Sequence, residues 1–252
     1  MPYRFATEQT DYSDYAAGRV FYSLPGHPAF PVRLTSEIFQ RCLAIRRRGE
    51  TVDRYIVYDP CCGAAYHLAA LGHLHGDRIE AIAGSDVDVD AVGRAAQNLA
   101  LLTPAGLSRR IGQIEAMRAA YGKTSHAEAL DSARALQARF AALVGGRAIP
   151  GHTFVADALH GAELAAGLGP TAVDIVLTDV PYGRHSEWRA TADAASPIAR
   201  MLDALLAVIS EQAVVAIAAD KKQRIEHRAY TRVERFQIGK RQVALLVRRG
   251  TI

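Results

Sequence analysis

The chain lacks the features of a secreted, membrane-spanning or metal-binding protein. Its three cysteines include the adjacent pair Cys61 and Cys62, and they form no CxxC motif or other metal-ligand spacing. No apolar run approaches the roughly 18–20 residues that a bilayer span requires. The first residues include an acid and lack the apolar segment of a signal peptide. We therefore expect a cytoplasmic protein with reduced cysteines, no metal ion and no membrane partner.

The overall composition favours a well-packed globular domain. Of the 252 residues, 50% are hydrophobic and 22% are charged, which argues against a disordered chain. The net charge is +4, with 30 lysines and arginines against 26 acids. This balance favours polyanionic partners only weakly, because many basic proteins never bind nucleic acid.

Short runs of β-forming residues alternate with longer helical stretches, as in a parallel sheet covered on both faces. Strands are expected at 55–58, 79–83, 153–156, 173–177 and 213–218, and helices at 33–48, 64–74 and 90–102. An antiparallel hairpin is expected at 230–238 and 242–247. The predicted fold class is therefore α/β, with a Rossmann-like, mostly parallel seven-stranded sheet flanked by helices in a single domain over 1–252.

Two segments extend this basic pattern. Residues 1–50 are expected to form an N-terminal helical extension whose helix begins at 35–36. Residues 104–150 are expected to form a helical insert between the second and third strands, with a capping box at Ser125 and Glu128. The insert either packs as a helical excursion or grips the substrate, and its pattern does not choose between these roles.

Acidic residues follow the first four expected parallel strands. Asp59 follows the first strand, Asp86 and Asp88 the second, Asp157 the third and Asp179 the fourth. Because the carboxyl ends of parallel strands form the ligand crevice of an open α/β sheet, these acids should converge on one edge. Asp86 is the first choice for binding both ribose hydroxyls of a nucleoside, and Asp157 could accept from an adenine amino group. Asp88 could instead cap the next helix.

Two of the strand-exit segments have further chemical features. The turn after the first strand contains small residues that let a ligand approach the backbone near a helix N-terminus. It reads Asp59-Pro60-Cys61-Cys62-Gly63-Ala64. The segment after the fourth strand offers the carboxylate of Asp179 and the carbonyl of Val180 to an amino group, with Pro181 stiffening the turn and Tyr182 able to stack on a ring. Taken alone, either segment could equally be a turn built for packing.

The motifs in this order resemble class I S-adenosylmethionine-dependent methyltransferases. The resemblance rests on Asp-Pro-x-Cys-Gly, Gly-x-Asp-Val-Asp-x-x-Ala-Val-x-x-Ala-x-x-Asn, Asp-Ala and Asp-Val-Pro-Tyr, and it covers roughly residues 30–250. It is nearest to members with an Asp/Asn-Pro-Pro-Tyr motif, which methylate exocyclic base nitrogens. With the helical insert and residues 26–35 included, the whole chain is similar to the AviRa family, avilamycin-resistance methyltransferases that act on large-subunit ribosomal RNA.

The resemblance implies a cofactor, a partner and a set of site residues. S-adenosylmethionine would be the cofactor, and 23S ribosomal RNA, with a guanine as acceptor base, would be the partner. Catalytic positions would be Asp179, Val180, Pro181 and Tyr182. Cofactor-binding positions would be Asp59, Pro60, Cys61, Gly63, Ala64, Asp86, Asp88, Asp157, Ala158 and Asp179. Two departures from the family pattern stand out: Gly63-Ala64-Ala65-Tyr66 replaces Gly-Ser-Gly-Thr, and Val180 replaces a proline.

Clustered cations support RNA as the partner. From Asp220 to the end of the chain, the sequence contains ten lysines and arginines and three acids. Such a cluster forms a phosphate-binding surface if its members share a face, although a solvated hairpin would show the same charges. The RNA-binding positions expected are Arg46, Arg47, Arg48, Arg109, Arg110, Lys221, Lys222, Arg224, Lys240 and Arg241.

Two other functions fit the same residues. An Asp-containing loop that holds a planar amino group also suits a methyltransferase that modifies a protein glutamine amide. A non-catalytic RNA-binding assembly factor with the same fold is the third candidate, to which Ala65 and Tyr66 lend modest support. For an RNA substrate, the residues leave the acceptor atom open between an exocyclic and a ring nitrogen.

Overall fold

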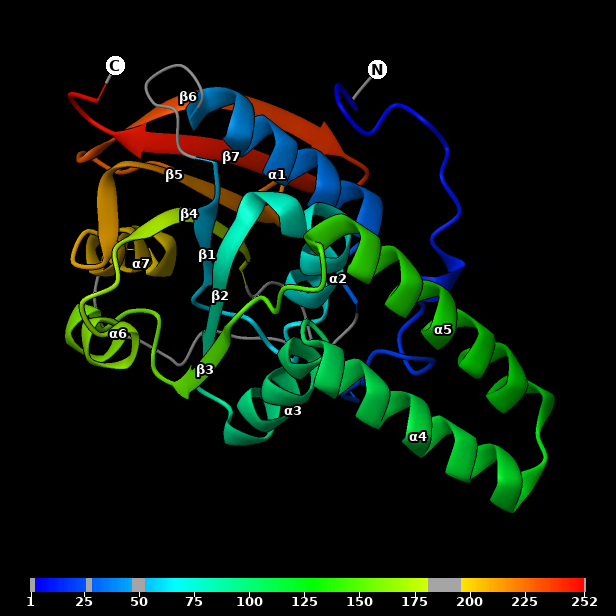
Figure 1. The fold of residues 1–252 in the computed structure, drawn as a ribbon. Helices are drawn as coiled ribbons and strands as arrows, with labels where there is room; N and C mark the ends of the chain where they lie inside the picture. Colours follow the sequence, from blue (N-terminus) through cyan, green and yellow to red (C-terminus); the bar gives the residue numbers. More distant parts are fainter. Residues whose placement is uncertain (1–2, 26–28, 47–52, 181–195, 252) are drawn as a thin grey trace.

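The sheet has the predicted Rossmann-like form. A computed structural model describes residues 3–25, 29–46, 53–180 and 196–251. Its seven strands follow the order β3-β2-β1-β4-β5-β7-β6 (Figure 1). Their bounds are β1 Tyr55–Asp59, β2 Ile79–Asp86, β3 Gly151–Val155, β4 Val173–Asp179, β5 Ile209–Asp220, β6 Tyr230–Ile238 and β7 Arg241–Arg248.

The strand directions bring the predicted acids to one edge of the sheet. Strands β1 to β5 pair in parallel, whereas β7 pairs antiparallel with β5 and with β6. Four of the five parallel strands run past their expected ends: β1 and β4 by one and two residues, β2 to Asp86 and β5 to Asp220. The additional polar residues continue the ladder pairing, as in Asp86↔Val155 and Asp179↔Ala218. These four parallel strands therefore finish with carboxylates that are still held by the sheet, whereas β3 ends at Val155, two residues before Asp157.

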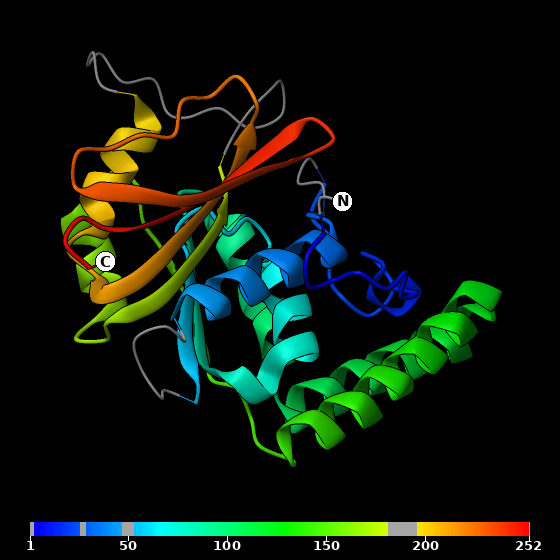
Figure 2. The ribbon, with the colours of Figure 1, turned by 90° about the horizontal axis from the view of Figure 1, so that it is seen from above.

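Helices cover both faces of the sheet and enclose two apolar cores. The described helices on one face are α1 Val32–Arg46, α2 Tyr66–His75 and α3 Val89–Ala100, and those on the other are α6 Gly161–Leu168 and α7 Pro197–Leu205 (Figure 2). Short 3-10 turns lie at Ser13–Tyr15 and Gly76–Arg78. None of the helices within the described ranges has the length and apolarity that a membrane span needs.

The segment at 104–150 contains a helical hairpin that projects from the sheet. Its helices are α4 Pro104–Tyr121 and α5 Thr124–Val144, which run side by side in Figures 1 and 2. Buried Leu130 and Phe140 join α5 to the core of the α1–α3 face. The predicted capping box is wrong: α5 begins at Thr124, and no side chain caps its first turn.

The N-terminal region is less helical than predicted. In the described part of residues 1–50, the only α-helix is α1, which begins at Val32 rather than at 35–36. Residues 3–25 contain a single 3-10 turn and otherwise run as irregular chain. An irregular segment must satisfy its backbone N–H groups through other partners.

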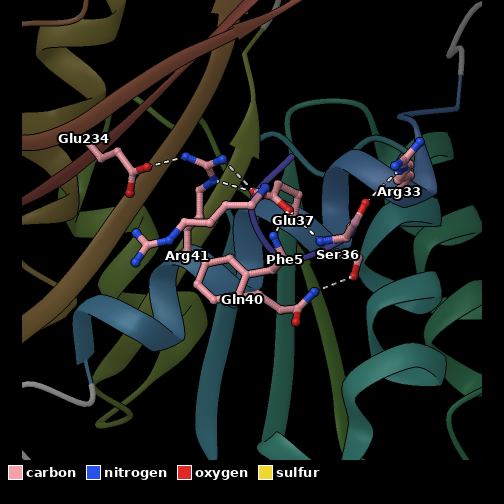
Figure 3. Close-up of polar contacts among 9 residues, drawn as sticks. Phe5, Arg33, Ser36, Glu37, Gln40, Arg41 and Glu234 are labelled. Carbon is pink, nitrogen blue, oxygen red and sulfur yellow. Dashed lines mark hydrogen bonds and ion pairs between the residues drawn. The ribbon is translucent and has the colours of Figure 1, made fainter. Parts of the chain in front are cut away.

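One buried carboxylate of α1 supplies those partners. Glu37 is 0% exposed and accepts hydrogen bonds from the backbone N–H groups of Arg4 at 2.6 Å, Phe5 at 2.8 Å and Ala6 at 2.7 Å. Arg41, one turn along the helix, donates from Nε to Glu37 at 2.7 Å and also pairs with Glu234 of β6 (Figure 3). Burial raises the pKa of Glu37, but these donors outweigh it and hold the pKa below its ordinary value.

We predict that Glu37→Gln destabilises the fold by about 2–4 kcal/mol, because it leaves buried donors and the Arg41 charge without a carboxylate. Chemical denaturation measures the change. Glu115→Gln, which removes an exposed pair with Arg134 at 3.0 Å, is the matched control and should cost less than about 1 kcal/mol. Equal effects for the two variants would contradict the role of Glu37.

The interactions of Glu37 also predict how the stability of the fold depends on pH. Since the folded protein lowers the pKa of Glu37, the stabilisation is fully present above the unfolded carboxyl pKa of about 4.3 and is lost as pH falls through the folded value. The stability difference between the wild type and Glu37→Gln should therefore shrink in acid.

Candidate active site at the carboxyl edge of the sheet

The side chain of Cys61 shows that the predicted strand-end residues meet. Burial of this thiol, and then the carboxylates of Asp59, Asp86 and Asp157, raise the pKa of Cys61 well above its usual value, while the nearby Thr178 side chain opposes them. These neighbours come from the ends of β1, β2, β3 and β4. The structure therefore brings residues from four strand ends near one side chain. Three of these residues are predicted site residues, and Thr178 precedes the fourth, Asp179.

The turn after β1 is held by the side chain of Asp59. This side chain is fully buried, accepts a hydrogen bond from the Cys61 N–H at 2.9 Å and pairs with His67 Nε2 at 2.9 Å. It therefore shapes the turn from beneath and offers no surface to a ligand. The backbone of the turn takes left-handed conformations at Gly63 (φ 52°) and Ala65 (φ 50°). Ala65 is the one non-glycine residue with positive φ among the described residues, and this conformation directs the chain into α2.

Asp86 at the end of β2 ties this turn to the neighbouring strand. Its Oδ2 accepts from the Gly63 N–H at 2.9 Å and its Oδ1 from the Asp88 N–H at 3.1 Å. The residue is partly exposed, and a carboxylate can accept about four hydrogen bonds. Asp88 has the capping role that the sequence left as an alternative, because its carboxylate accepts from the N–H groups of Asp90 and Ala91.

The ends of β2 and β3 add an apolar surface beside these acids. Val87 is 36% exposed and Val155 54% exposed, although both belong to a residue type that is usually buried. Asp157 follows, with Oδ1 accepting from the Leu159 N–H at 2.9 Å and its side chain partly exposed, while Ala158 is buried. An apolar surface between carboxylates suits a flat heterocycle with polar edges.

Asp179 and Val180 lie at the end of β4, on the same edge of the sheet. The Val180 N–H donates to the Ala218 carbonyl of β5 at 3.0 Å, which extends the sheet pairing into this loop. Asp179 Oδ1 lies 3.7 Å from Arg241 Nε, and both side chains are about one quarter exposed, at 23% and 28%. Pro181 and Tyr182, predicted to complete this half of the site, lie outside the described residues.

Two residues that support the site were missed by the sequence reading. Asn98 on α3 is fully buried and donates to the carbonyls of Ala64 at 2.8 Å and Tyr22 at 2.9 Å. His67 on α2 packs edge-on against Phe30 and pairs with Asp59. Asn98 did end the most specific sequence motif, but its partners are distant in the chain and no local pattern reveals them.

The predicted RNA-binding cations divide into exposed and buried groups. Two are corrected: the guanidinium of Arg46 is buried against Asp174 at 3.1 Å, and that of Arg110 donates to the carbonyls of residues 19 and 20. Both hold the fold together, so neither presents its charge to RNA. Arg47 and Arg48 lie outside the described residues. The residues exposed as predicted are Arg109, Lys221, Lys222, Arg224 and Lys240, whereas Arg241 turns toward Asp179.

The fold and this edge have the form of a Rossmann-like methyltransferase, and comparison with known proteins shows the family. The AviRa rRNA methyltransferase family matches residues 1–241. A 23S rRNA (guanine(2535)-N(1))-methyltransferase of Streptomyces viridochromogenes is 41% identical over 250 residues, covering 99% of this chain and 97% of that protein.

Solved structures agree with the sequence comparison. Two structures of the rRNA methyltransferase AviRa from Streptomyces viridochromogenes match with a TM-score of 0.86 each and identities of 41% and 40%, over 98% of this chain and 96% of theirs. The chain belongs to the AviRa rRNA methyltransferase family.

Gly84 provides a test of how tightly the edge is packed. A Cβ at this position on β2 would lie 3.0 Å from both Cβ and Sγ of Cys62, in the turn after β1. We predict that Gly84→Ala costs about 1–3 kcal/mol through this overlap. Gly93→Ala is the matched control: it adds the same methyl group to exposed α3, where nothing lies within 4 Å, and should stabilise by about 0.5–1 kcal/mol. Denaturation curves that shift in the same direction for both would contradict this packing.

Proposed function

We propose that this enzyme transfers a methyl group from S-adenosylmethionine to N1 of a guanine in 23S ribosomal RNA, and that the modification confers avilamycin-type resistance. The observation that carries the proposal is similarity at 41% identity, over nearly the whole of both chains, to a protein named for that reaction. The edge described above supports it independently. It combines acceptors for a nucleoside with a carboxylate beside exposed cations.

The residues at the ends of β1 to β3 fit the cofactor. Asp86 would accept from the ribose hydroxyls, Val87 and Val155 would contact the adenine, and Asp157 would lie near its amino group. The backbone of Gly63 and Ala64 would face the methionine part. Asp59 would act from below by holding the turn, and Asp88 by capping α3. The bound cofactor supplies a methyl group on a positively charged sulfur, which leaves as a neutral thioether.

The residues at the end of β4 fit the acceptor base. The Watson–Crick edge of guanine presents an N1–H and an amino group side by side, and a carboxylate can accept from both. Asp179 would hold this edge and take the N1 proton, so that the N1 lone pair faces the methyl group. The carbonyl of Val180 would be a second acceptor for the amino group. The chief contribution of these residues is alignment, which can supply roughly 7–11 kcal/mol in well-oriented reactions.

Exposed cations on both sides of this corner fit the RNA backbone. Lys221 and Lys222 follow β5, and the Lys221 N–H donates to the carbonyl of Lys240, in the β6–β7 turn, at 3.3 Å. A groove of about 550 Å³ is lined by residues that follow Lys222 and by the start of β6 and the end of β7. Its lining includes Arg224, Arg228, Arg232 and Arg249. Phosphate binding by such a surface weakens steeply as salt rises.

The proposed reaction is tested by nucleoside mass spectrometry. Wild-type protein is incubated with labelled S-adenosylmethionine and either large ribosomal subunits from an avilamycin-sensitive strain, free 23S rRNA or protein extract. We expect label in 1-methylguanosine. Label in protein would instead establish the glutamine alternative, and RNA binding without label the non-catalytic one.

Asp179→Asn distinguishes the acceptor atom. Asparagine keeps the shape and one acceptor oxygen but cannot take a proton at neutral pH, so methylation at N1 should fall by about 10²–10⁴-fold. A variant that stays within threefold of the wild type, at saturating cofactor, would contradict proton removal by Asp179 and favour an exocyclic acceptor.

Asp86 is tested by cofactor binding alone. We predict that Asp86→Ala weakens the affinity for S-adenosylmethionine about 10²-fold, because two charge-assisted hydrogen bonds are lost. Isothermal titration calorimetry measures this without RNA. Asp131→Ala, which removes an exposed acid of α5, should leave the affinity unchanged. Unaltered binding by Asp86→Ala would contradict the placement of the ribose.

A further inference from the structure

We propose that Arg241 selects guanine as the acceptor base: its guanidinium donates to O6 and balances the negative charge that develops there when Asp179 takes the N1 proton. This inference rests on the proposed guanine-N1 activity and adds a specificity-determining residue to it. It also changes the role of Arg241 from the phosphate contact that the sequence suggested to contact with the base.

The sheet register places Arg241 and Asp179 on the same face. Asp179 of β4 is opposite Ala218 of β5, and Asp220 of β5 is opposite Arg241 of β7. Residues 218 and 220 are two apart on one strand, so all four side chains lie on the same side of the sheet. Ala218 contributes only a methyl group beside Asp179. The longer arginine side chain therefore reaches across β5, and its Nε comes within 3.7 Å of Asp179 Oδ1.

A chain of aromatic and polar contacts fixes the position of this guanidinium. Arg241 lies over the ring of Phe30 at 5.4 Å from its centroid, and Phe30 packs edge-on against His67 at 5.9 Å. His67 in turn pairs with buried Asp59. The arginine of the acceptor half is thus connected to the turn of the cofactor half. A surface arginine that binds phosphate does not need such support.

A carboxylate beside a guanidinium matches guanine and opposes adenine. The Watson–Crick edge of guanine presents O6 as an acceptor next to two donors, N1–H and N2–H. Asp179 suits the donors and Arg241 suits O6. Adenine presents an amino donor at the position of O6 and an acceptor at N1. Its donor would therefore face the donors of Arg241, and its acceptor would face the carboxylate of Asp179.

The chemistry of N1 also requires a positive group at this position. Guanine N1 is a much weaker acid than a carboxyl group, so proton transfer to Asp179 is uphill unless the resulting anion is stabilised. The charge of that anion is shared between N1 and O6. A guanidinium at O6 acts as a preorganised donor of the oxyanion-hole type, and removing one such donor typically costs about 10²–10³-fold in rate.

Within the described ranges, the other charged groups at this corner do not supply an alternative donor on the same face. Asp220, opposite Arg241, accepts from the Lys222 N–H at 2.9 Å. Lys221 and Lys240 are exposed and joined through their backbones. Of the described cations, Arg241 is the one with an ion pair to Asp179.

The test compares three variants on the RNA that the wild type methylates. Arg241→Ala should lower the methylation rate at neutral pH about 10²–10³-fold, and Arg241→Lys, which keeps the charge but not the planar donor pair, about 10-fold. Arg54→Ala is the matched control. It removes an arginine that pairs with Glu80 at 3.5 Å at the opposite end of the parallel strands, and it should act like the wild type. Thermal unfolding verifies that each variant is folded.

A pH profile separates the proposed role from a merely structural one. Because hydroxide removes the N1 proton at high pH, the deficit of Arg241→Ala relative to the wild type should shrink as the pH rises. A structural defect or a lost phosphate contact would lower the rate by the same factor throughout.

Base discrimination in binding gives a readout that needs no reaction. Fluorescence anisotropy, without S-adenosylmethionine, compares fragments with guanosine, inosine or adenosine at the target position. We expect the wild type and Arg54→Ala to bind the guanosine fragment at least about 10-fold more tightly than the adenosine fragment, and Arg241→Ala to lose this preference. Inosine keeps O6 but lacks the amino group, so Arg241→Ala should weaken binding to it as strongly as to guanosine.

The outcomes distinguish this inference from the proposed function. If the wild type forms no 1-methylguanosine, the proposed function fails and the inference fails with it. If the wild type is active but Arg241→Ala keeps its rate within threefold, or loses rate equally at all pH values without losing base preference, only the role of Arg241 is overturned.

Discussion

The parallel direction of β1 to β5 is the constraint from which the site follows. Parallel strands end at one edge, so residues separated by more than a hundred positions in the chain meet there without further arrangement. The carboxylate of Asp86 then joins two of these ends through the Gly63 N–H, and the Val180 N–H joins a third to β5. The edge is therefore a connected surface and not a set of independent loops.

Buried polar pairs support this surface from the α1–α3 side. Asp59 pairs with His67 beneath the turn after β1, and Asn98 donates to the carbonyl of Ala64 at the end of this turn. Phe30 packs between His67 and Arg241. Asp59 and Asn98 each have a hydrogen-bond partner in the turn, and loss of either side chain would leave a costly unsatisfied atom. The cofactor half and the acceptor half are in this way positioned by the same packing. A methyltransferase requires that relation, because alignment is its main contribution to rate.

The sequence predicted the features that arise from local pattern and missed those that depend on distant partners. Strand centres, the C-terminal hairpin and the carboxylates at the strand ends were visible in runs of β-forming residues followed by acids. The full length of β5 was not, because Ser210–Gln212 are polar, and Ile209 before them pairs with Val173 of β4 across a register shift that no local pattern reveals. Arg46 and Arg110 appeared as surface cations, but Asp174 and two backbone carbonyls bury them. The capping box at Ser125 and Glu128 has the right spacing, yet the N-cap of α5 is Lys123, two residues before Ser125.

Hydrogen–deuterium exchange with and without S-adenosylmethionine tests the central claim, that one edge of the sheet forms a single nucleoside site, most directly. The account predicts that the cofactor slows exchange in peptides that cover 59–66, 84–90 and 154–159 together, and leaves the opposite strand ends near 53–55 and 169–173 unchanged. Protection confined to one of these segments, or located at the opposite ends, would contradict it.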